Sequence, residues 1–400
     1  MPDRTLFLHA GGSKTGSSAL QVFLYVLAER LQELGFFYCK LGLPVKDDFT
    51  VTAGNGVNLY SALSDRWTDE AVWRSNIRNA LLSLFAELQH GAICSSETLS
   101  LLSGQQWLTL REIAAEERIT LIVCFYVRNL ADFLSSSYDQ ALRHGYSFTW
   151  PQFLEATKEW EHYNALRRLE QTFDKQTLRV MSYDQLKNRI VESFLEVLGV
   201  SENFDANVVG RCNQRIVNRS MTTAEREILC ALNGSSAGRL SSILSDALVS
   251  ANRQAKPEPN DVGEASMQRL EEIFGSQVQW INDNFFSSEN VVRLAGSGNH
   301  SEVESERSKE DELTAYKAAF KALVLEVGNS RAAAKEDIIA RLLAIDWENA
   351  SDPAIPPEFD PFGYLLLNGD LLIADVRPFR HYIDYGVRES RNWKLTNGRR

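Results

Sequence analysis

The sequence predicts an α/β protein with a mainly parallel sheet flanked by helices and a helical C-terminal extension. Short apolar runs alternate along the chain with segments of helical periodicity, as in βαβ units. The run Ile119–Val127 is apolar apart from Thr120, as expected of a strand buried on both faces. A glycine-rich turn at residues 11–16 separates the first apolar run from the first helical pattern.

Each predicted strand is a short apolar run bounded by polar or turn-forming residues. The five runs are Leu6–His9, Gly35–Tyr38, Ala92–Ser96, Ile119–Val127 and Leu178–Ser182. Helical patterns separate these runs, so the strands are expected to lie parallel in one sheet. Their carboxyl ends would then meet at one edge, where open parallel sheets bind ligands.

Helices are predicted where apolar residues recur at helical spacing. The first helix begins near Ser17 and contains the apolar residues Leu20, Phe23, Leu24 and Leu27. Two helices are expected before the third strand, the first with Trp67 and Trp73 and the second covering Ile77–Leu88. Another follows the long strand at Leu130–Arg143.

The second half of the chain is predicted to be mostly helical. A helical pattern extends from Thr222 to about Phe286, with a polar loop at 256–260, and residues 296–311 form a polar linker. Two helices are expected near 310–327 and 332–345, before a compact segment at Phe359–Trp393. We therefore expect three regions: a main domain at 1–295, a linker with helices at 296–350, and a small helical module at 351–400.

The composition restricts the classes of function. A formal net charge of −11 over 400 residues argues against nucleic-acid binding, which normally needs a basic surface. The five cysteines are scattered without a CxxC or His/Cys pattern, so no metal site is expected. Neither a signal-peptide core nor a run of about 18 apolar residues is present, so we expect a cytoplasmic protein without a transmembrane segment.

The turn after the first strand has the composition of an anion-binding loop. Its candidate ligand-binding residues are Gly12, Ser13, Lys14, Thr15, Gly16, Ser17 and Ser18. Glycines let the backbone approach a ligand closely, and N–H groups at the helix start face a bound anion. Lys14 adds a positive charge, and the serines add hydroxyl donors.

The order of residues in this loop differs from that of ATP-binding proteins. An ATP-type P-loop has lysine after its second glycine, whereas here Lys14 precedes Gly16. The segment HAGGSKTGSSALQ resembles the 5′-phosphosulfate loop of bacterial sulfotransferases, whose pattern is close to HxGxxKTG[ST][ST]xLQ. The resemblance implies a P-loop-like sheet and the donor 3′-phosphoadenosine-5′-phosphosulfate, with Lys14 on the 5′-phosphate and bridging oxygen.

A second pair of residues extends this resemblance. The family has an arginine at the end of a central strand and a serine eight residues later, which together hold the 3′-phosphate; here these are Arg128 and Ser136. The family usually has proline where this chain has Leu130. Further similar segments are YDQL, LGV and NRSM, so the resemblance covers about residues 5–290 and implies a sulfotransferase domain.

Transfer to a hydroxyl needs a general base, and two residues are candidates. Glu97 ends the third predicted strand, on the same sheet edge as Lys14 and Arg128, and relatives often carry a similar SSE segment. It could instead be a carboxylate that stabilises a helix N-terminus. His9 ends the first strand and is the other candidate base, or else a packed histidine that supports the turn. The segment Gly54-Asn55-Gly56 lines the acceptor cleft or forms an ordinary turn.

The C-terminal segment resembles a helical module found at the ends of bacterial polysaccharide-synthesis proteins. The similar parts are Asp360–Leu365, Asn368–Asp370, His381-Tyr382, Tyr385-Gly386 and Glu389–Arg391. The resemblance implies a glycan or glycoconjugate acceptor and peripheral association with polysaccharide-synthesis machinery. The module itself is either a docking element or a helical cap.

Two other functions remain open from the sequence. A P-loop kinase or nucleotide hydrolase would share the parallel sheet, but the lysine–glycine order and the lack of a clear acidic magnesium site speak against it. A non-catalytic, glycan-associated scaffold would retain only a decayed nucleotide site. The presence of Lys14, Arg128 and Ser136 speaks against decay.

Overall fold

The computed structural model divides the chain into two compact units, each made of three separate stretches. The first unit comprises Met1–Phe133, Lys158–Asn218 and Gly263–Ser297, and the second comprises Leu134–Thr157, Arg219–Val262 and Gly298–Arg400. The described residues are 4–40, 54–65, 69–85, 91–205, 209–210, 220–234, 241–251, 260, 262–286, 291–296, 319, 349–368, 371, 376–389, 391 and 393.

The first unit contains five strands, with helices between them. The strands are β1 (Arg4–His9), β2 (Phe36–Tyr38), β3 (Gly91–Ser95), β4 (Ile119–Val127) and β5 (Leu178–Ser182). Its helices are α1 (Ser17–Val26), α2 (Ala28–Glu33), α3 (Val57–Ser64), α4 (Glu70–Leu82), α5 (Gly104–Glu116), α8 (Glu161–Glu170), α9 (Tyr183–Leu186), α10 (Ile190–Leu198) and α14 (Glu264–Phe285), with short 3-10 helices at Glu97–Leu101 and Ser201–Asn203.

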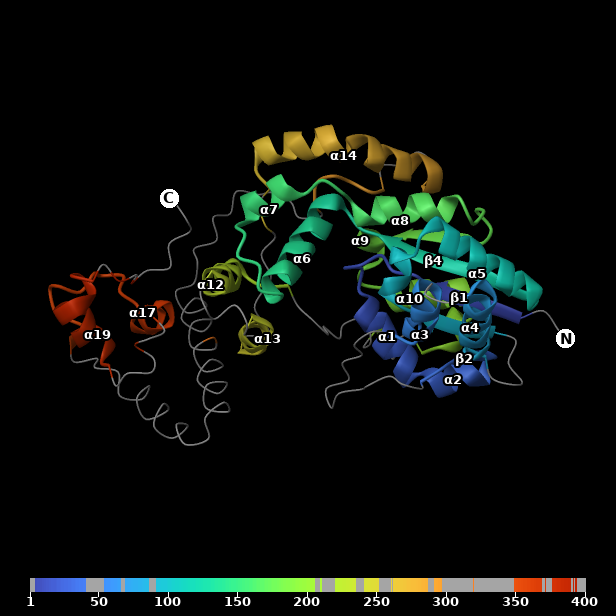
Figure 1. Cartoon of the computed structure of the whole chain (residues 1–400), viewed down its shortest axis with the longest axis horizontal. Helices are drawn as coiled ribbons and strands as arrows, with labels where there is room; N and C mark the ends of the chain where they lie inside the picture. Colours follow the sequence, from blue (N-terminus) through green and yellow to red (C-terminus); the bar gives the residue numbers. More distant parts are fainter. Residues whose placement is uncertain are drawn as a thin grey trace. The chain divides into compact units, whose positions relative to one another are not determined.

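All five strands pair in parallel, in the order β2-β3-β1-β4-β5, and helices surround them in Figure 1. The α/β prediction with a parallel sheet is therefore confirmed. β1 is the middle strand, and its last residue His9 lies opposite Ser95 of β3 and Cys124 of β4. The chain continues from β1 to β2 and β3 on one side of β1, and then crosses to β4 and β5 on the other side. A ligand crevice is expected at the carboxyl end of β1, where the direction of the strand order changes.

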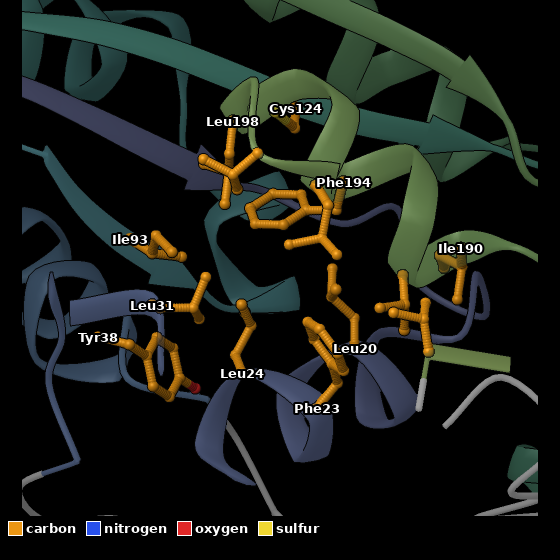
Figure 2. Packing of buried hydrophobic residues seen from close by; sticks show 14 of the residues in the cluster. Leu20, Phe23, Leu24, Leu31, Tyr38, Ile93, Cys124, Ile190, Phe194 and Leu198 are labelled. Carbon is orange, nitrogen blue, oxygen red and sulfur yellow. The ribbon is translucent and has the colours of Figure 1, made fainter. Parts of the chain in front are cut away.

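One face of the sheet is covered by α1, α2 and α10. The buried side chains of this layer include Leu20, Phe23, Leu24, Leu31, Ile93, Cys124, Ile190, Phe194 and Leu198. Figure 2 shows Phe194 of α10 and Leu20 of α1 pointing toward one another within the layer. Burying these apolar surfaces anchors α1, and with it the turn that precedes the helix, on the sheet.

The other face of the sheet carries α5 and α8. α5 packs against β4, and the ring of Phe125 in β4 meets the ring of His162 in α8 edge-on, with centroids 5.7 Å apart. Helix α14 packs in turn on α8, where Trp280 contacts Tyr163 at 5.4 Å. The start of α8 is thereby held close to the end of β4.

The structure corrects the prediction for the helices before the third strand. Trp73 and Ile77 lie on one helix, α4, whereas the pattern placed them on two. The reason is a cap: the Asp69 side chain accepts a hydrogen bond from the Ala71 N–H at 2.8 Å, so the helix begins before Trp73. The preceding helix is α3, and Trp67 lies outside the described residues.

The regular secondary structure described in the second unit is helical. Its helices are α7 (Trp150–Ala156), α12 (Thr223–Asn233), α13 (Ser241–Ala251), α17 (Pro361–Leu367), α19 (Pro378–His381) and a π-helical turn at Tyr382–Gly386. Helix α6 (Leu130–Arg143) begins in the first unit and continues in the second. The predicted bounds of α6 are confirmed.

The C-terminal segment shares a hydrophobic core with helices from the middle of the chain. One buried cluster contains Leu142 of α6, Leu229 of α12 and Leu244 of α13, together with Tyr364 and Tyr382. Within the same unit, the Arg226 guanidinium and the Asp139 carboxylate form a buried ion pair at 2.6 Å. The compact units thus divide the chain differently from the predicted regions 1–295, 296–350 and 351–400. The predicted linker and its two helices fall almost entirely outside the described residues.

Candidate functional site

The loop after β1 continues the sheet for three residues before it turns away. Ala10 donates a backbone hydrogen bond to Cys124 at 2.9 Å, and Gly12 donates one to Tyr126 at 2.9 Å. Tyr126 donates in return to the Gly11 carbonyl at 2.7 Å. The base of the loop is therefore held by β4, and only the residues after Gly12 form the turn.

The turn itself contains a lysine in the left-handed region. Lys14 has φ 63° and Gly16 has φ 75°. A non-glycine residue with positive φ is uncommon, and such residues concentrate where a ligand is held. The Thr15 hydroxyl donates to the Gly12 carbonyl at 2.6 Å and closes the turn from inside.

Helix α1 begins directly after this turn. Its N-cap residue is Gly16, which has no side chain to accept from the first helical N–H groups. The N–H groups of a first turn have no partner within the helix, and the helix dipole adds positive potential there. The turn and the helix start therefore have the geometry that anion-binding loops use.

The predicted loop residues all lie in this turn or in the first turn of α1. Gly12, Thr15 and Ser17 are buried, and Ser13, Lys14, Gly16 and Ser18 are half-buried. Their arrangement is compatible with binding an anion. Binding of the 5′-phosphosulfate by these seven residues stays a prediction.

Glu97 lies beside the loop, at the end of β3. The Ser96 N–H donates to the His9 carbonyl at 3.0 Å, so β3 and β1 end next to each other. Burial raises the pKa of the Glu97 carboxyl, and the negative charge of Glu161 acts in the same direction. The nearby Ser17 hydroxyl and the Lys14 ammonium act to lower it. The structure thus brings Glu97 together with Lys14, as the strand ends suggested.

A second carboxylate, Glu161, reaches the same place from the start of α8. The Ser13 hydroxyl donates to Glu161 Oε2 at 3.1 Å. The Ser100 hydroxyl lies 3.2 Å from Glu161 Oε1 and 2.7 Å from the Glu97 carbonyl, so its one proton is shared between two acceptors. Glu161 therefore ties the loop to the segment that carries Glu97. The sequence holds no signal for this contact.

Arg128 is the first residue after β4, and its side chain contacts the loop. Its Nη1 donates to the Lys14 carbonyl at 2.9 Å, and its guanidinium lies 5.3 Å from the centre of the Tyr183 ring. Its Nε is 4.0 Å from a carboxylate oxygen of Asp184. Asp184 also accepts from the Asn129 N–H at 2.6 Å, which anchors the end of β4. Arg128 is thus next to Lys14, as predicted.

The structure does not bring Ser136 together with Arg128 in one unit. Ser136 lies on α6, in the part of that helix that belongs to the second unit, and is half-buried, as are its neighbours Ser135 and Ser137. The Ser135 hydroxyl accepts from the Asn260 side chain at 2.8 Å. The role of Ser136 as a phosphate ligand stays a prediction.

His9 is completely buried in the layer of α1 and α10. Its Nδ1 lies 2.8 Å from the Ser95 hydroxyl, and its ring meets Tyr126 and Phe194 edge-on. Burial lowers the pKa of His9 to about 4, so the ring is neutral near pH 7. A fully buried ring cannot reach an acceptor hydroxyl without rearrangement, so this environment favours the packed histidine over the base.

Asn55 fastens the glycine-containing turn before α3 to the end of β3. Its side-chain amide donates to the Ile93 carbonyl and accepts from the Ser95 N–H, both at 2.8 Å. Gly54 has φ 68°, and a Cβ there would lie 1.9 Å from the Ser95 carbonyl. This turn therefore supports the strand that leads into Glu97.

Sequence motifs identified only part of this site. Glu161, His162 and Asp184 contact the loop or the end of β4, although Glu161 is 148 positions from Ser13 and His162 is 149. Such contacts depend on which strands and helices become neighbours. Asp184 lies in the segment YDQL, which the sequence offers only as a family resemblance.

In the described part of the chain, no group of three or more His, Cys, Asp or Glu side chains is arranged to hold a metal ion. None of the helices described is both long and apolar enough to cross a bilayer.

Comparison of the chain with known family models finds no match, and comparison with curated proteins finds none either.

Proposed function

We propose that this chain is an enzyme, a sulfotransferase that moves a sulfuryl group from 3′-phosphoadenosine-5′-phosphosulfate to an acceptor hydroxyl. One observation carries the proposal. Lys14, in a loop with anion-binding geometry, lies beside Glu97, a half-buried residue whose carboxyl pKa is raised, at the carboxyl edge of the sheet. Sulfuryl transfer needs a positive charge at the leaving oxygen and a base at the attacking one.

In the proposed reaction, the acceptor oxygen forms a new bond to sulfur while the bond from sulfur to the bridging oxygen breaks. The electron pair of that bond stays on the 5′-phosphate of the nucleotide. Lys14 stabilises the negative charge that develops there, and the N–H groups of the loop and of the α1 start hold the phosphate. Glu97 takes the proton of the acceptor hydroxyl.

The raised pKa of Glu97 supports its role as the base. A carboxylate whose pKa lies nearer the working pH is a stronger base than an exposed one. Burial and the neighbouring Glu161 both raise the pKa of this carboxyl. His9, the other candidate, is fully buried and hydrogen-bonded to Ser95, so we assign the base to Glu97.

Arg128 is the proposed ligand of the 3′-phosphate. Among the described residues, the buried Nε of Arg128 has no hydrogen-bond partner. An arginine with an unused donor next to an anion-binding loop is suited to a second phosphate, because charge-assisted bonds to phosphate are strong. Tyr183 and Asp184 hold its guanidinium in place.

The proposed acceptor is a glycan or glycoconjugate, and its support is the resemblance of the C-terminal segment to the module of polysaccharide-synthesis proteins. Peripheral association with such machinery belongs to the same proposal. A cytoplasmic location is proposed because scattered cysteines are typical of a reducing compartment. The negative charge of the chain supports a small nucleotide as partner over a nucleic acid.

The proposal is tested by comparing Lys14→Ala with the exposed-lysine variant Lys175→Ala, which changes the net charge equally. We expect Lys14→Ala to lower sulfuryl transfer about 100- to 1,000-fold, the usual loss for one electrostatic stabiliser of the transition state. Lys175→Ala should transfer at the wild-type rate. The measurement is transfer of labelled sulfate from the donor to a panel of glycans, with unfolding temperatures as the folding control.

Two results would contradict the proposal. One is a Lys14→Ala variant that keeps more than about a tenth of the wild-type rate, since loss of the stabilising charge predicts a much larger effect. The other is a wild-type chain that does not bind 3′-phosphoadenosine-5′-phosphate but hydrolyses ATP with magnesium. That second result would favour the kinase or hydrolase alternative.

A further inference from the structure

His162 joins the anion-binding type of loop to the end of β4. It is the second residue of α8 and is fully buried. Its Nδ1 accepts a hydrogen bond from the backbone N–H of Arg128 at 3.2 Å, and its Nε2 lies 2.8 Å from the carbonyl oxygen of Ser13. One imidazole ring therefore contacts two segments of the candidate site.

These two contacts determine where the proton of the ring lies. A backbone N–H can only donate, so Nδ1 must carry a lone pair and no proton. Nε2 then carries the proton and donates it to the Ser13 carbonyl. Burial lowers the pKa of His162 to about 4, so the ring stays neutral near pH 7. A charged ring would place an N–H at Nδ1 against the Arg128 N–H.

Close packing holds the ring in this orientation. The ring centroid of His162 is 4.5 Å from Phe133 and 5.7 Å from Phe125. On the loop side it faces Gly12, where a Cβ would come within 2.4 Å of Nε2. Glycine is needed at position 12 because the imidazole of His162 occupies the space that a side chain would fill. The sequence suggested another reason for this glycine, the close approach of a ligand to the backbone.

The hydrogen bonds from His162 and Arg128 orient two consecutive peptide groups. His162 holds the carbonyl of Ser13, and Arg128 Nη1 holds the carbonyl of Lys14 at 2.9 Å. In a planar trans peptide the N–H points opposite to the C=O. The N–H groups of Lys14 and Thr15 are therefore directed away from His162 and Arg128, and successive N–H groups arranged in this way form anion-binding nests.

We propose that His162 is a positioning residue, which as the neutral Nε2–H tautomer sets the peptide orientation of the loop so that the Lys14 and Thr15 amides face a bound anion. The identity of the anion as a donor phosphate rests on the proposed function. The tautomer and the peptide orientation do not. A histidine that merely filled the core would need neither ring nitrogen to reach the loop.

Three substitutions of His162 test the hydrogen bonds of its two ring nitrogens separately. His162→Gln keeps a donor near the Nε2 position and loses the acceptor for Arg128. His162→Asn keeps an acceptor near the Nδ1 position and does not reach Ser13. His162→Phe keeps the ring and its aromatic contacts and removes both hydrogen bonds. The measured quantities are the dissociation constant for 3′-phosphoadenosine-5′-phosphate and the unfolding temperature of each variant.

We expect His162→Gln to bind the nucleotide within about threefold of wild type, and the Asn and Phe variants to bind about tenfold or more weakly, because the Ser13 carbonyl loses its donor. Wild-type affinity in the Asn and Phe variants would overturn the proposal. So would losses of affinity in all three variants that follow only their unfolding temperatures, as a purely structural role predicts.

The tautomer is measured separately, from the ring nitrogen signals of ¹⁵N-histidine-labelled full-length protein at pH 7. A neutral Nε2–H ring at His162 supports the proposal, and an Nδ1–H or charged ring overturns it. If the wild-type chain does not bind the nucleotide, the proposed function fails while this measurement still decides the role of His162.

With inorganic phosphate as the probe, the Lys14 and Thr15 amide signals should shift in wild type and in His162→Gln, and a lack of shift in wild type would overturn the nest.

Discussion

At the scale of single residues, neighbouring groups have opposing effects on the pKa of the Glu97 carboxyl. Partial burial and the nearby Glu161 raise the pKa of the Glu97 carboxyl, while Ser17 and Lys14 favour the charged form. Glu97 also begins a 3-10 helix, so a role in stabilising that helix start remains the alternative. The two roles predict different results for the same substitution.

Glu97→Gln keeps the shape of the side chain and removes its charge. As a base, Glu97 should contribute about 100- to 10,000-fold to turnover and little to donor binding. As a helix-stabilising charge, it should contribute roughly 0.3–1 kcal/mol of stability and nothing to the chemistry. Turnover, nucleotide affinity and unfolding temperature measured on this variant distinguish the two, and near-normal turnover would refute the base.

Glu161→Gln is the matched variant for the pH dependence of turnover. The rate should rise with pH as Glu97 loses its proton, around a pKa above the usual carboxyl range. Removing the charge of Glu161 removes one cause of that raised pKa. The rising limb of the pH–rate profile should therefore move to lower pH, and an unmoved limb would contradict the assignment of this limb to a Glu97 carboxyl whose pKa is raised by Glu161.

His9 gives a pH dependence of stability with a defined sign. Burial lowers its pKa from 6.5 to about 4. Between these values the unfolded chain binds more protons at this residue, so the stabilisation present above pH 6.5 is lost as the pH falls toward 4. His9→Asn removes the titrating imidazole. Glu97 titrates in both proteins, so it does not affect the difference between them.

We therefore expect the unfolding temperature of wild type to fall more steeply from pH 7 to pH 5 than that of His9→Asn. The comparison is made within one buffer series, so that the contributions of other groups cancel. Parallel curves for the two proteins would show that His9 is not buried as a neutral ring.

At the scale of elements, the end of β3 depends on the turn before α3. The Asn55 side chain satisfies the Ile93 carbonyl and the Ser95 N–H. A buried backbone group left without its partner costs about 1–3 kcal/mol. Glu97 follows Ser95 by two residues, so displacement of this strand end also displaces the proposed base.

Asn55→Ala should lower the free energy of unfolding by roughly 2–6 kcal/mol, since two buried backbone groups lose their partner. The control is Asn58→Ala, on the exposed side of α3, which should change stability by less than about 0.5 kcal/mol. Denaturant unfolding measures both. Equal stability of the two variants would mean that water replaces the Asn55 amide.

At the scale of the whole molecule, the C-terminal segment belongs to the same compact unit as α12 and α13. The Tyr364 side chain is fully buried, and its hydroxyl lies 2.8 Å from Nδ1 of His381. A cluster shared among Leu229, Leu244 and Tyr364 predicts that these segments unfold together.

Tyr364→Ala tests this shared core, with the exposed Tyr385→Ala as control. The buried substitution should cost about 3–5 kcal/mol, as large-to-small changes of aromatic core residues do. Hydrogen exchange should then increase in α12 and α13 as well as in α17, while the strands β1–β5 stay protected. Increased exchange confined to α17 would show that the C-terminal segment is a separate module.

The sequence by itself determined the elements whose signals are local. The bounds of β4, β5 and α6 follow from a continuous apolar run, a short strand pattern and a helical periodicity, and the structure has the same bounds. The loop with Lys14 also follows from local composition. Each of these features depends on residues close together in the chain, where spacing and residue type are sufficient.

Only the tertiary structure decided which distant segments meet. The strand order, the approach of Glu161 and His162 to the loop, and the sharing of one core by Tyr364 and α12 all lie beyond local patterns. Whether His9 points into a packed layer or toward a ligand was equally open in the sequence. The physical reason is that sheet pairing and burial depend on contacts between residues far apart in the chain, which spacing along the sequence does not encode.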